Sequence, residues 1–189
     1  MAEHLLVRHG QTEWSRDRRH TGRTDIPLMD EGRRQAEALR AFLADREFAR
    51  VLTSPLSRAA ETCRLAGLGD RAELRDELLE WDYGEYDGLT TAHIREARPG
   101  WSLWRDGCPG GETAADVGAR ADRLVAELRA LDGDAVLFAH GHVLRVLGAR
   151  WVGLEPEGGS LLYLSTATVC ALGWERENAV IRRWNSPPA

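Results

Sequence analysis

Short apolar runs alternate along the chain with segments in which apolar residues recur at every third or fourth position. The runs are long enough for buried strands and lie at residues 5–7, 51–53, 135–139, 169–174 and 180–184. The periodic segments predict helices over residues 30–45, from 55 to about 65, 117–131 and 142–152. Strands that alternate with helices favour an α/β domain with a mainly parallel sheet.

Individual residues set the expected ends of these elements. Asp30 is expected to cap the first helix, Pro55 to stand in the first turn of the second, and Gly133 to end the third. The stretch 74–80 is ambiguous and could hold one more short strand. The 189 residues contain no internal repeat, low-complexity tract or linker, so we expect a single domain over residues 1–189.

The basic residues of the chain are all of one kind. There are 25 arginines and no lysine, against 30 acidic residues, which gives a formal net charge of −5. The absence of lysine excludes a P-loop lysine, a Schiff-base lysine and a lysine general base. The acidic balance also argues against nucleic acid as a partner, because proteins that bind phosphate backbones carry a basic excess.

The sequence also carries signals about its compartment. No apolar run approaches the ~18 residues needed to span a bilayer, so no membrane partner is expected. The first four residues lack the basic region and apolar stretch of a signal peptide. Cys63, Cys108 and Cys170 are odd in number and far apart, which indicates neither a disulfide framework nor a zinc ribbon. We therefore expect a cytoplasmic protein in a reducing compartment.

Polar side chains follow three of the predicted strands directly. The segments 8–14, 53–62 and 139–142 hold Arg8, His9, Arg58 and His140. Because the carboxyl ends of parallel strands meet at one edge of a sheet, these side chains are expected to share a pocket. Arginine grips phosphate oxygens through paired hydrogen bonds, and neutral histidine can act as a nucleophile or a donor. The combination describes an oxyanion pocket, with phosphate as the natural occupant.

Several motifs together resemble the histidine phosphatase superfamily, which has the phosphoglycerate mutase-like fold. Its Arg-His-Gly signature is matched by residues 8–10, and its Ser-Pro-x-x-Arg-x-x-x-Thr pattern by residues 54–62. Further matches lie at 21–25, at 80–88 (the acid segment), at 110–113, and at 140–142 (the second histidine motif). The resemblance implies a three-layer α/β sandwich with helices on both faces of a mainly parallel central sheet.

The resemblance also implies catalytic roles that the chemistry of the residues supports. His9 would attack phosphorus in line and form a phosphohistidine, with its other ring N–H held by an acceptor such as a backbone carbonyl. Arg8, Arg58 and His140 would hold the non-bridging oxygens and stabilise their transition-state charge. Glu80 would protonate the leaving oxygen and then deprotonate water. No metal or other cofactor is expected, because arginine and histidine supply the positive charge.

Secondary contacts and alternative assignments complete the predicted site. The resemblance implies substrate contacts from Ser15, Thr21, Gly22, Tyr83, Gly141 and His142. Five acidic neighbours of Glu80 could take its role instead: Asp76, Glu77, Asp82, Glu85 and Asp87. The pair His140 and His142 has a spacing seen in zinc sites, but no convincing cluster of further ligands accompanies it. The remaining histidines are expected to be solvated or structural, with His20 a candidate for the pocket rim: His4, His20 and His93.

The main alternative function is a cofactor-dependent phosphoglycerate mutase, which uses the same phosphohistidine. The resemblance implies that mutases of the family are longer than this chain, with lysine and paired arginines between the acid segment and the Gly-Gly-Glu segment. Here only 21 residues lie between Gly88 and Gly110, Thr91 falls near the place of that lysine, and the arginines occur singly. Water is therefore the expected acceptor, which favours a phosphatase. A phosphate-binding module without turnover is the third possibility.

Similarity to particular branches of the family narrows the class of substrate that is expected. The segments 80–86, 104–108 and 138–142 are similar to the sedoheptulose-bisphosphatase branch and to short bacterial acid phosphatases. The expected partner is a small phosphorylated metabolite, a sugar phosphate or bisphosphate. Dimers occur in the superfamily, so a homodimer is compatible with the resemblance.

Overall fold

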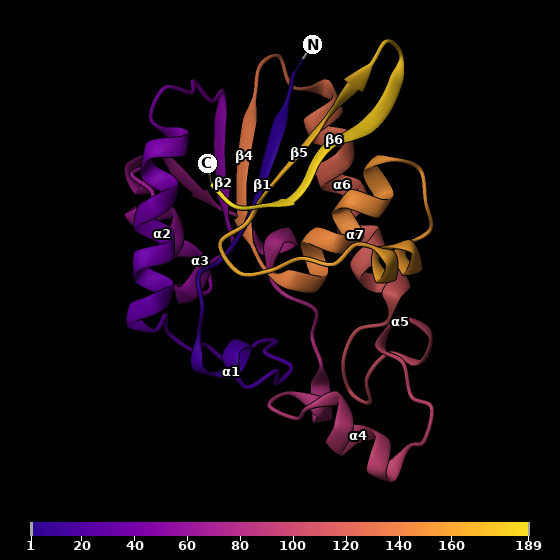
Figure 1. Ribbon diagram of the computed structural model, residues 1–189. Helices are drawn as coiled ribbons and strands as arrows, with labels where there is room; N and C mark the ends of the chain where they lie inside the picture. Colours follow the sequence, from indigo (N-terminus) through magenta and orange to yellow (C-terminus); the bar gives the residue numbers. More distant parts are fainter. Residues whose placement is uncertain (1, 189) are drawn as a thin grey trace.

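The structure, a computed structural model, describes residues 2–188 and is built on one six-stranded sheet (Figure 1). The strand order is β3-β2-β4-β1-β5-β6. The strands are β1 (His4–Arg8), β2 (Arg50–Thr53), β3 (Ala72–Leu74), β4 (Ala135–Ala139), β5 (Val169–Glu175) and β6 (Asn178–Ser186). The first four are parallel to one another, whereas β5 and β6 are antiparallel to their neighbours. The predicted mainly parallel sheet is confirmed.

The helices connect these strands. The α-helices are α1 (Glu13–Arg16), α2 (Asp30–Leu43), α3 (Ser57–Leu65), α4 (Thr91–Ala97), α5 (Leu103–Asp106), α6 (Ala114–Ala130) and α7 (Gly141–Trp151). Short 3-10 helices are η1 (Gly69–Arg71), η2 (Asp76–Leu78), η3 (Gly84–Tyr86) and η4 (Pro156–Leu161). Within residues 2–188, no helix has the length and apolar character that a bilayer crossing requires.

Helices cover both faces of the sheet, α2 and α3 on one side and α6 and α7 on the other (Figure 1). Successive side chains of a strand point to opposite faces, so Leu5 and Val7 of β1 pack on one side and Leu6 on the other. Leu5 and Val7 join Leu39 of α2 in one buried cluster, and Leu6 joins Leu124 of α6 in a second. The two cores on either side of the sheet confirm the three-layer α/β sandwich.

Two predicted helix starts are wrong by one or two residues. α2 begins at Asp30 itself, its N-cap is Met29, and no side chain caps it by a hydrogen bond. Asp30 therefore acts through its charge at the positive end of the helix rather than as a cap. α3 begins at Ser57, so Pro55 precedes the helix instead of occupying its first turn. The Ser54 hydroxyl accepts the Leu56 N–H and so closes the turn that precedes α3.

Two other boundaries also differ from the prediction. α6 ends at Ala130 with Leu131 as its C-cap, so Gly133 lies beyond the helix. The positive φ of Gly133, +107°, is used in the turn that leads into β4. The additional strand, β3, ends at Leu74, where the ambiguous stretch begins, and η2 lies within that stretch.

The register of the sheet brings three strand ends to the same level. Arg8 of β1 lies beside Ala139 of β4, and the end of β2 lies on the other side of β4. The ladder continues for one more residue, because the His9 N–H donates to the Ala139 carbonyl at 2.9 Å. The residues that follow each strand, which include His9, Ser54 and His140, therefore meet at one edge of the sheet.

Candidate active site

The His9 side chain follows β1 and is only 4% exposed. Its Nδ1 lies 2.7 Å from the Gly10 carbonyl oxygen. A carbonyl can only accept, so the proton of the neutral ring is on Nδ1 and the lone pair is on Nε2. Burial, followed by the charges of Arg58 and Arg8, holds the pKa of His9 well below its ordinary value. His9 is therefore a neutral imidazole with Nε2 available to attack, and the predicted backbone acceptor is confirmed.

Gly10 fixes the peptide group that holds His9. A Cβ at Gly10 would lie 2.2 Å from the Gly32 carbonyl oxygen of α2, so no side chain fits there. The Gly10 N–H donates to the Thr62 hydroxyl at 3.1 Å, and that hydroxyl donates to the Arg58 carbonyl at 2.7 Å. One turn of α3 thus braces the loop after β1, which is the structural reason for the spacing of arginine and threonine in the motif.

Arg58 is fully buried at the start of α3. Its Nη1 donates to the Thr24 carbonyl at 3.1 Å, and its Nη2 donates to the Thr21 and Gly22 carbonyls at 3.1 and 2.8 Å. Its Nε donates to His140 Nδ1 at 3.1 Å. A guanidinium has five N–H groups, so a single one on Nη1 remains unused. Arg58 holds the loop 21–25 in place, and its charge acts from inside the protein.

His140 is the N-cap of α7 and lies fully buried beside His9, with ring centroids 5.1 Å apart. Because its Nδ1 accepts from Arg58, the ring proton is on Nε2, which donates to the Ser54 hydroxyl at 2.8 Å. Burial and then the Arg58 charge lower the pKa of His140 well below its ordinary value. Arg58, His140 and Ser54 therefore form a hydrogen-bonded chain behind His9.

Arg8 presents an unused donor at this edge of the sheet. Its Nη1 donates to the Leu164 carbonyl at 2.6 Å, but its buried Nε has no hydrogen-bond partner within residues 2–188. A Cβ at Gly141 would lie 3.4 Å from Nε and Cζ of Arg8, so the backbone at the start of α7 packs directly beside the guanidinium. A buried donor without an acceptor costs about 1–3 kcal/mol. A bound oxygen that accepts from Arg8 Nε would remove this cost.

Glu80 lies at the N-terminus of α7 and is 4% exposed. Its Oε1 accepts from the backbone N–H groups of Trp81 and Val143, each at 2.9 Å, and its Oε2 accepts from that of His142 at 3.0 Å. Three hydrogen bonds fix the orientation of the carboxyl group, and Oε2 keeps capacity for a proton. Of the acidic residues considered for this role, Glu80 lines the cavity described below, and the other five do not.

Tyr83 sets the orientation of His142. The Tyr83 Oη lies 2.6 Å from His142 Nδ1. Burial raises the pKa of Tyr83 and lowers the pKa of His142, in each case far enough to keep the group neutral. A phenol is the better donor and an imidazole nitrogen the better acceptor, so His142 carries its proton on Nε2. His20 packs 4.8 Å from the Tyr83 ring, and burial lowers its pKa to about 4.

These groups surround a cavity of about 480 Å³ at the carboxyl edge of the sheet. Eight of the predicted site residues line it: Arg8, His9, Ser15, Thr21, Glu80, Tyr83, Gly141 and His142. Arg58, His140 and Gly22 lie outside the lining and support it from behind. His20 also lines the cavity, which confirms its expected place at the rim. The Ser15 hydroxyl is committed to the capping box that begins α1.

Five further lining residues were not predicted from the sequence: Arg18, Arg19, Arg145, Tyr163 and Leu164. Arg145 stands three residues after His142 in α7, a spacing that places both on one face of a helix. That spacing was the available signal for Arg145. Arg18 and Arg19 lie between two recognised motifs, and only the turn after α1 directs them to the cavity.

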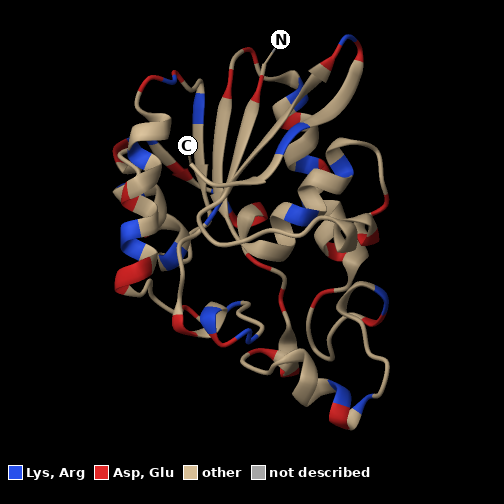
Figure 2. Ribbon diagram, viewed as in Figure 1, with Lys and Arg blue, Asp and Glu red and all other residues tan. Residues whose placement is uncertain are grey.

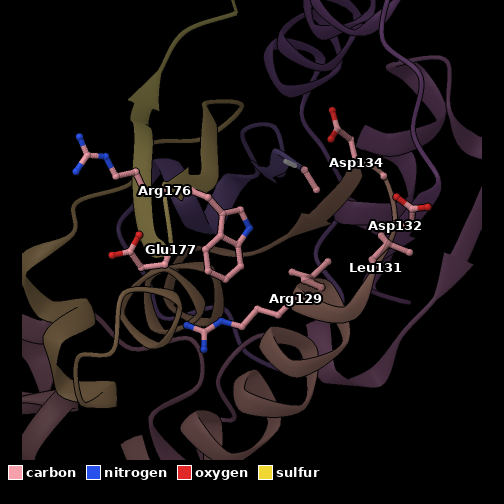
Figure 3. A pocket seen from close by; sticks show the side chains of 10 residues that line it. Arg129, Leu131, Asp132, Asp134, Arg176 and Glu177 are labelled. Carbon is pink, nitrogen blue, oxygen red and sulfur yellow. The ribbon is translucent and has the colours of Figure 1, made fainter.

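A larger cavity, about 670 Å³, lies at the opposite edge of the sheet (Figure 3). Its labelled lining, which includes Arg129, Asp132 and Glu177, contains no histidine or cysteine. His4 stands at this end of β1 but is fully buried edge-on to Trp151, so it is structural. Within residues 2–188, no group of three or more His, Cys, Asp or Glu side chains is arranged to hold a metal ion. The chemistry therefore locates the site at the smaller cavity.

Known sequences resemble this chain over most of its length. The model of the histidine phosphatase superfamily (branch 1) matches residues 4–187. An acid phosphatase of Mycobacterium tuberculosis is 45% identical over 175 residues, which cover 90% of this chain and 86% of that protein. Sedoheptulose 1,7-bisphosphatase of Saccharomyces cerevisiae is 38% identical over 184 residues, which cover 79% of this chain and 67% of that protein.

Solved structures agree over nearly the whole chain. The structure of an open reading frame product of Mycobacterium tuberculosis superposes with a TM-score of 0.94 at 40% identity, covering 100% of this chain and 99% of that one. A mycobacterial glucosyl-3-phosphoglycerate phosphatase in complex with VO3 superposes with a TM-score of 0.87 at 31% identity, covering 98% and 100%.

Proposed function

The chain belongs to the histidine phosphatase superfamily (branch 1), and we propose that it hydrolyses a phosphomonoester of a small metabolite through a phosphohistidine intermediate. The observation that carries this proposal is the neutral, buried His9, whose proton is held on Nδ1 by the Gly10 carbonyl. The unpartnered Nε–H of Arg8 supports a phosphate beside it. Relatives named as acid phosphatase and sedoheptulose 1,7-bisphosphatase support hydrolysis as the reaction.

In the first step, His9 Nε2 attacks phosphorus on the side opposite the ester oxygen. A P–N bond forms as the P–O bond breaks, and charge spreads over the three non-bridging oxygens. Arg8 donates its Nε–H to one of these oxygens. Arg58 and His140 act from behind His9: the buried guanidinium of Arg58 stabilises the charge on the oxygens, and His140 links that guanidinium to Ser54.

Glu80 moves the proton in both steps. It first donates a proton to the leaving ester oxygen, which departs as an alcohol. In the second step, the Glu80 carboxylate takes a proton from water as the water oxygen attacks the phosphohistidine. The P–N bond breaks, inorganic phosphate forms, and the lone pair of His9 Nε2 is restored. The three backbone N–H groups that hold Glu80 support this role, because they keep the carboxyl group in one orientation.

The reaction is proposed to need no metal ion or other cofactor. The guanidinium groups of Arg8 and Arg58 supply two fixed positive charges, which match the charge of a phosphomonoester dianion. We expect the rate to be unchanged by EDTA. Loss of the rate in EDTA, with recovery on adding zinc, would contradict this mechanism.

The proposed substrate is a sugar phosphate or a related small metabolite. The cavity of about 480 Å³ is within the usual range for small-molecule sites, and the relatives include a glucosyl-3-phosphoglycerate phosphatase. Ser15, Thr21, Gly22, Gly141 and the Tyr83–His142 pair are proposed as its secondary contacts. A cytoplasmic location is also proposed. It is supported by three buried, unpaired cysteines whose thiol pKa burial raises to about 12.

A substrate screen with phosphate detection tests the proposal. It should cover sugar phosphates, sugar bisphosphates, phosphoglycerates and phosphopeptides, and we expect the highest kcat/KM on a sugar ester. Preference for a phosphopeptide would contradict the metabolite class. Efficient interconversion of 2- and 3-phosphoglycerate with little phosphate release would indicate a mutase instead. His9→Ala should abolish release, whereas His93→Ala, which changes an exposed histidine outside the cavity, should not.

A further inference from the structure

Many surface arginines pair with a carboxylate, and the arginines that line the active-site cavity differ from them in this respect. Elsewhere arginines pair with carboxylates, as Arg33 does with Glu61 and Arg150 does with Asp122. The cavity is lined by Arg8, Arg18, Arg19 and Arg145, and Glu80 is the one carboxylate in that lining. Within residues 2–188, none of these four arginines has a carboxylate oxygen within 4.0 Å.

One phosphate does not account for this much positive charge. A phosphomonoester dianion is matched by Arg8 together with the buried Arg58. Arg18, Arg19 and Arg145 add three more positive charges in a chain whose net charge is −5. Unpaired like charges that share a cavity repel one another, and a second anion relieves that repulsion.

Arg18 occupies a backbone position that favours glycine. α1 ends at Arg16, the Arg19 N–H donates to the Trp14 carbonyl at 2.9 Å, and the Arg18 N–H donates to the Ser15 carbonyl at 3.3 Å. This pair of bonds is a Schellman closure, and its left-handed residue is Arg18, with φ +57°. Any side chain destabilises that conformation relative to glycine. The arginine is therefore present at a cost to stability, which indicates a use for its side chain.

The three additional arginines come from elements other than the one that supplies Arg8. Arg18 and Arg19 lie in the loop that follows α1, where basic segments gather beneath the strand ends (Figure 2). Arg145 comes from α7 and is held over the Trp104 ring at 4.7 Å. Its Nε and Nη2 donate to backbone carbonyls of the η4 segment, which leaves Nη1 unused.

We propose that Arg18, Arg19 and Arg145 bind a second anionic group of the substrate, a phosphate or a carboxylate, while the first phosphate lies against His9. The inference rests on the proposed function, because it assumes that the cavity holds a phosphate ester. It defines the substrate class as doubly anionic: a sugar bisphosphate, or a phosphate ester that also carries a carboxylate.

Matched substrate pairs test the second site. Fructose 1,6-bisphosphate is compared with fructose 6-phosphate, and 3-phosphoglycerate with glycerol 3-phosphate. We expect the doubly anionic member of at least one pair to have the higher kcat/KM, by about tenfold, which corresponds to one charge-assisted contact. The pair that shows the difference identifies the second group as phosphate or carboxylate. The advantage should shrink as salt is raised, because the two loop arginines are exposed.

Variants then assign the effect to these residues. The double variant Arg18→Gln with Arg19→Gln should lose the advantage and keep its rate on the singly anionic substrate within about twofold. Arg16→Gln is the matched control, because Arg16 is exposed on α1, pairs with Asp17 and does not line the cavity. Arg18→Gly should lower the advantage without lowering Tm, a combination that a purely structural role would not produce. If the esters are hydrolysed and neither pair shows an advantage, or if the double variant and Arg18→Gly both keep the wild-type ratios, the second site is wrong.

Calorimetric binding to the His9→Ala protein separates this inference from the proposed function. A protein that hydrolyses none of the four esters would overturn the proposed function. In that protein, tighter binding of the doubly anionic probe than of its singly anionic match still supports the second site, provided that Arg18→Gln with Arg19→Gln removes the difference. Equal affinities for both members of both pairs would overturn the second site whatever the outcome for hydrolysis.

Discussion

Thr62→Val tests how the fold holds the nucleophile. The Thr62 hydroxyl accepts the Gly10 N–H at 3.1 Å and donates to the Arg58 carbonyl at 2.7 Å. Valine keeps the shape and removes the hydroxyl, so the Gly10 N–H is left buried without a partner. The Arg58 carbonyl keeps its bond within α3, because a helix carbonyl accepts from four residues on. The cost is therefore that of one orphaned donor, about 1–3 kcal/mol.

The expected loss converts to a thermal shift and a change in rate. For a domain of this size, 1 kcal/mol lowers Tm by about 2–4 °C, so Thr62→Val should melt about 2–12 °C below the wild type. Calorimetry measures this shift. The Gly10 carbonyl orients the His9 ring, and its displacement should also lower kcat by about tenfold, equivalent to one hydrogen bond. Thr62→Ser keeps the hydroxyl and should recover most of both losses. Wild-type Tm and kcat in Thr62→Val would refute the reasoning.

Three further predictions concern protons. Glu80→Gln should lower kcat on a sugar phosphate by about 10²–10⁴-fold. On p-nitrophenyl phosphate the loss should be much smaller, because nitrophenolate leaves without a proton. Equal losses on the two substrates would count against Glu80 as the acid. The pKa of His9 is well below its ordinary value, so protonation of His9 should not lower kcat/KM near pH 6.5. NMR titration of the His9 ring checks this. His9, His140 and His142 all have folded pKa values below the unfolded value of 6.5, so they contribute stability that is present above pH 6.5 and lost as pH falls below it. Tm should therefore decrease between about pH 7 and 5, and a Tm that rises over this interval would contradict those shifts.

The sequence is most informative where an apolar run ends in polar residues. The run 5–7 predicts a buried strand, and Arg8 and His9 directly after it had to emerge at the edge where the strand ends meet. The same reasoning places His140 after the strand 135–139. Both expectations depend only on local pattern and on the geometry of parallel sheets, and the structure places these residues together.

Long-range hydrogen bonds limit what the sequence can predict. Arg58 was expected to grip phosphate, yet four of its five N–H groups bond the loop 21–25 and the His140 ring. Those partners are 34 or more positions away along the chain, so no local pattern encodes them. Arg18 was missed for a different reason. Its side chain reaches the cavity because the backbone turns in a left-handed conformation, and an arginine in the sequence does not predict such a turn.

The central claim is that His9 carries the phosphoryl group, and trapping that group tests it most directly. Wild-type protein is quenched in alkali within the first turnover of a radiolabelled phosphate ester, and the labelled peptide is sequenced. We predict an acid-labile, alkali-stable label on His9 that is present in His93→Ala and absent in His9→Ala. With p-nitrophenyl phosphate as donor, the label should accumulate in Glu80→Gln, because the second step lacks its base. Turnover without a label on His9, or with the label on another residue, would contradict the mechanism.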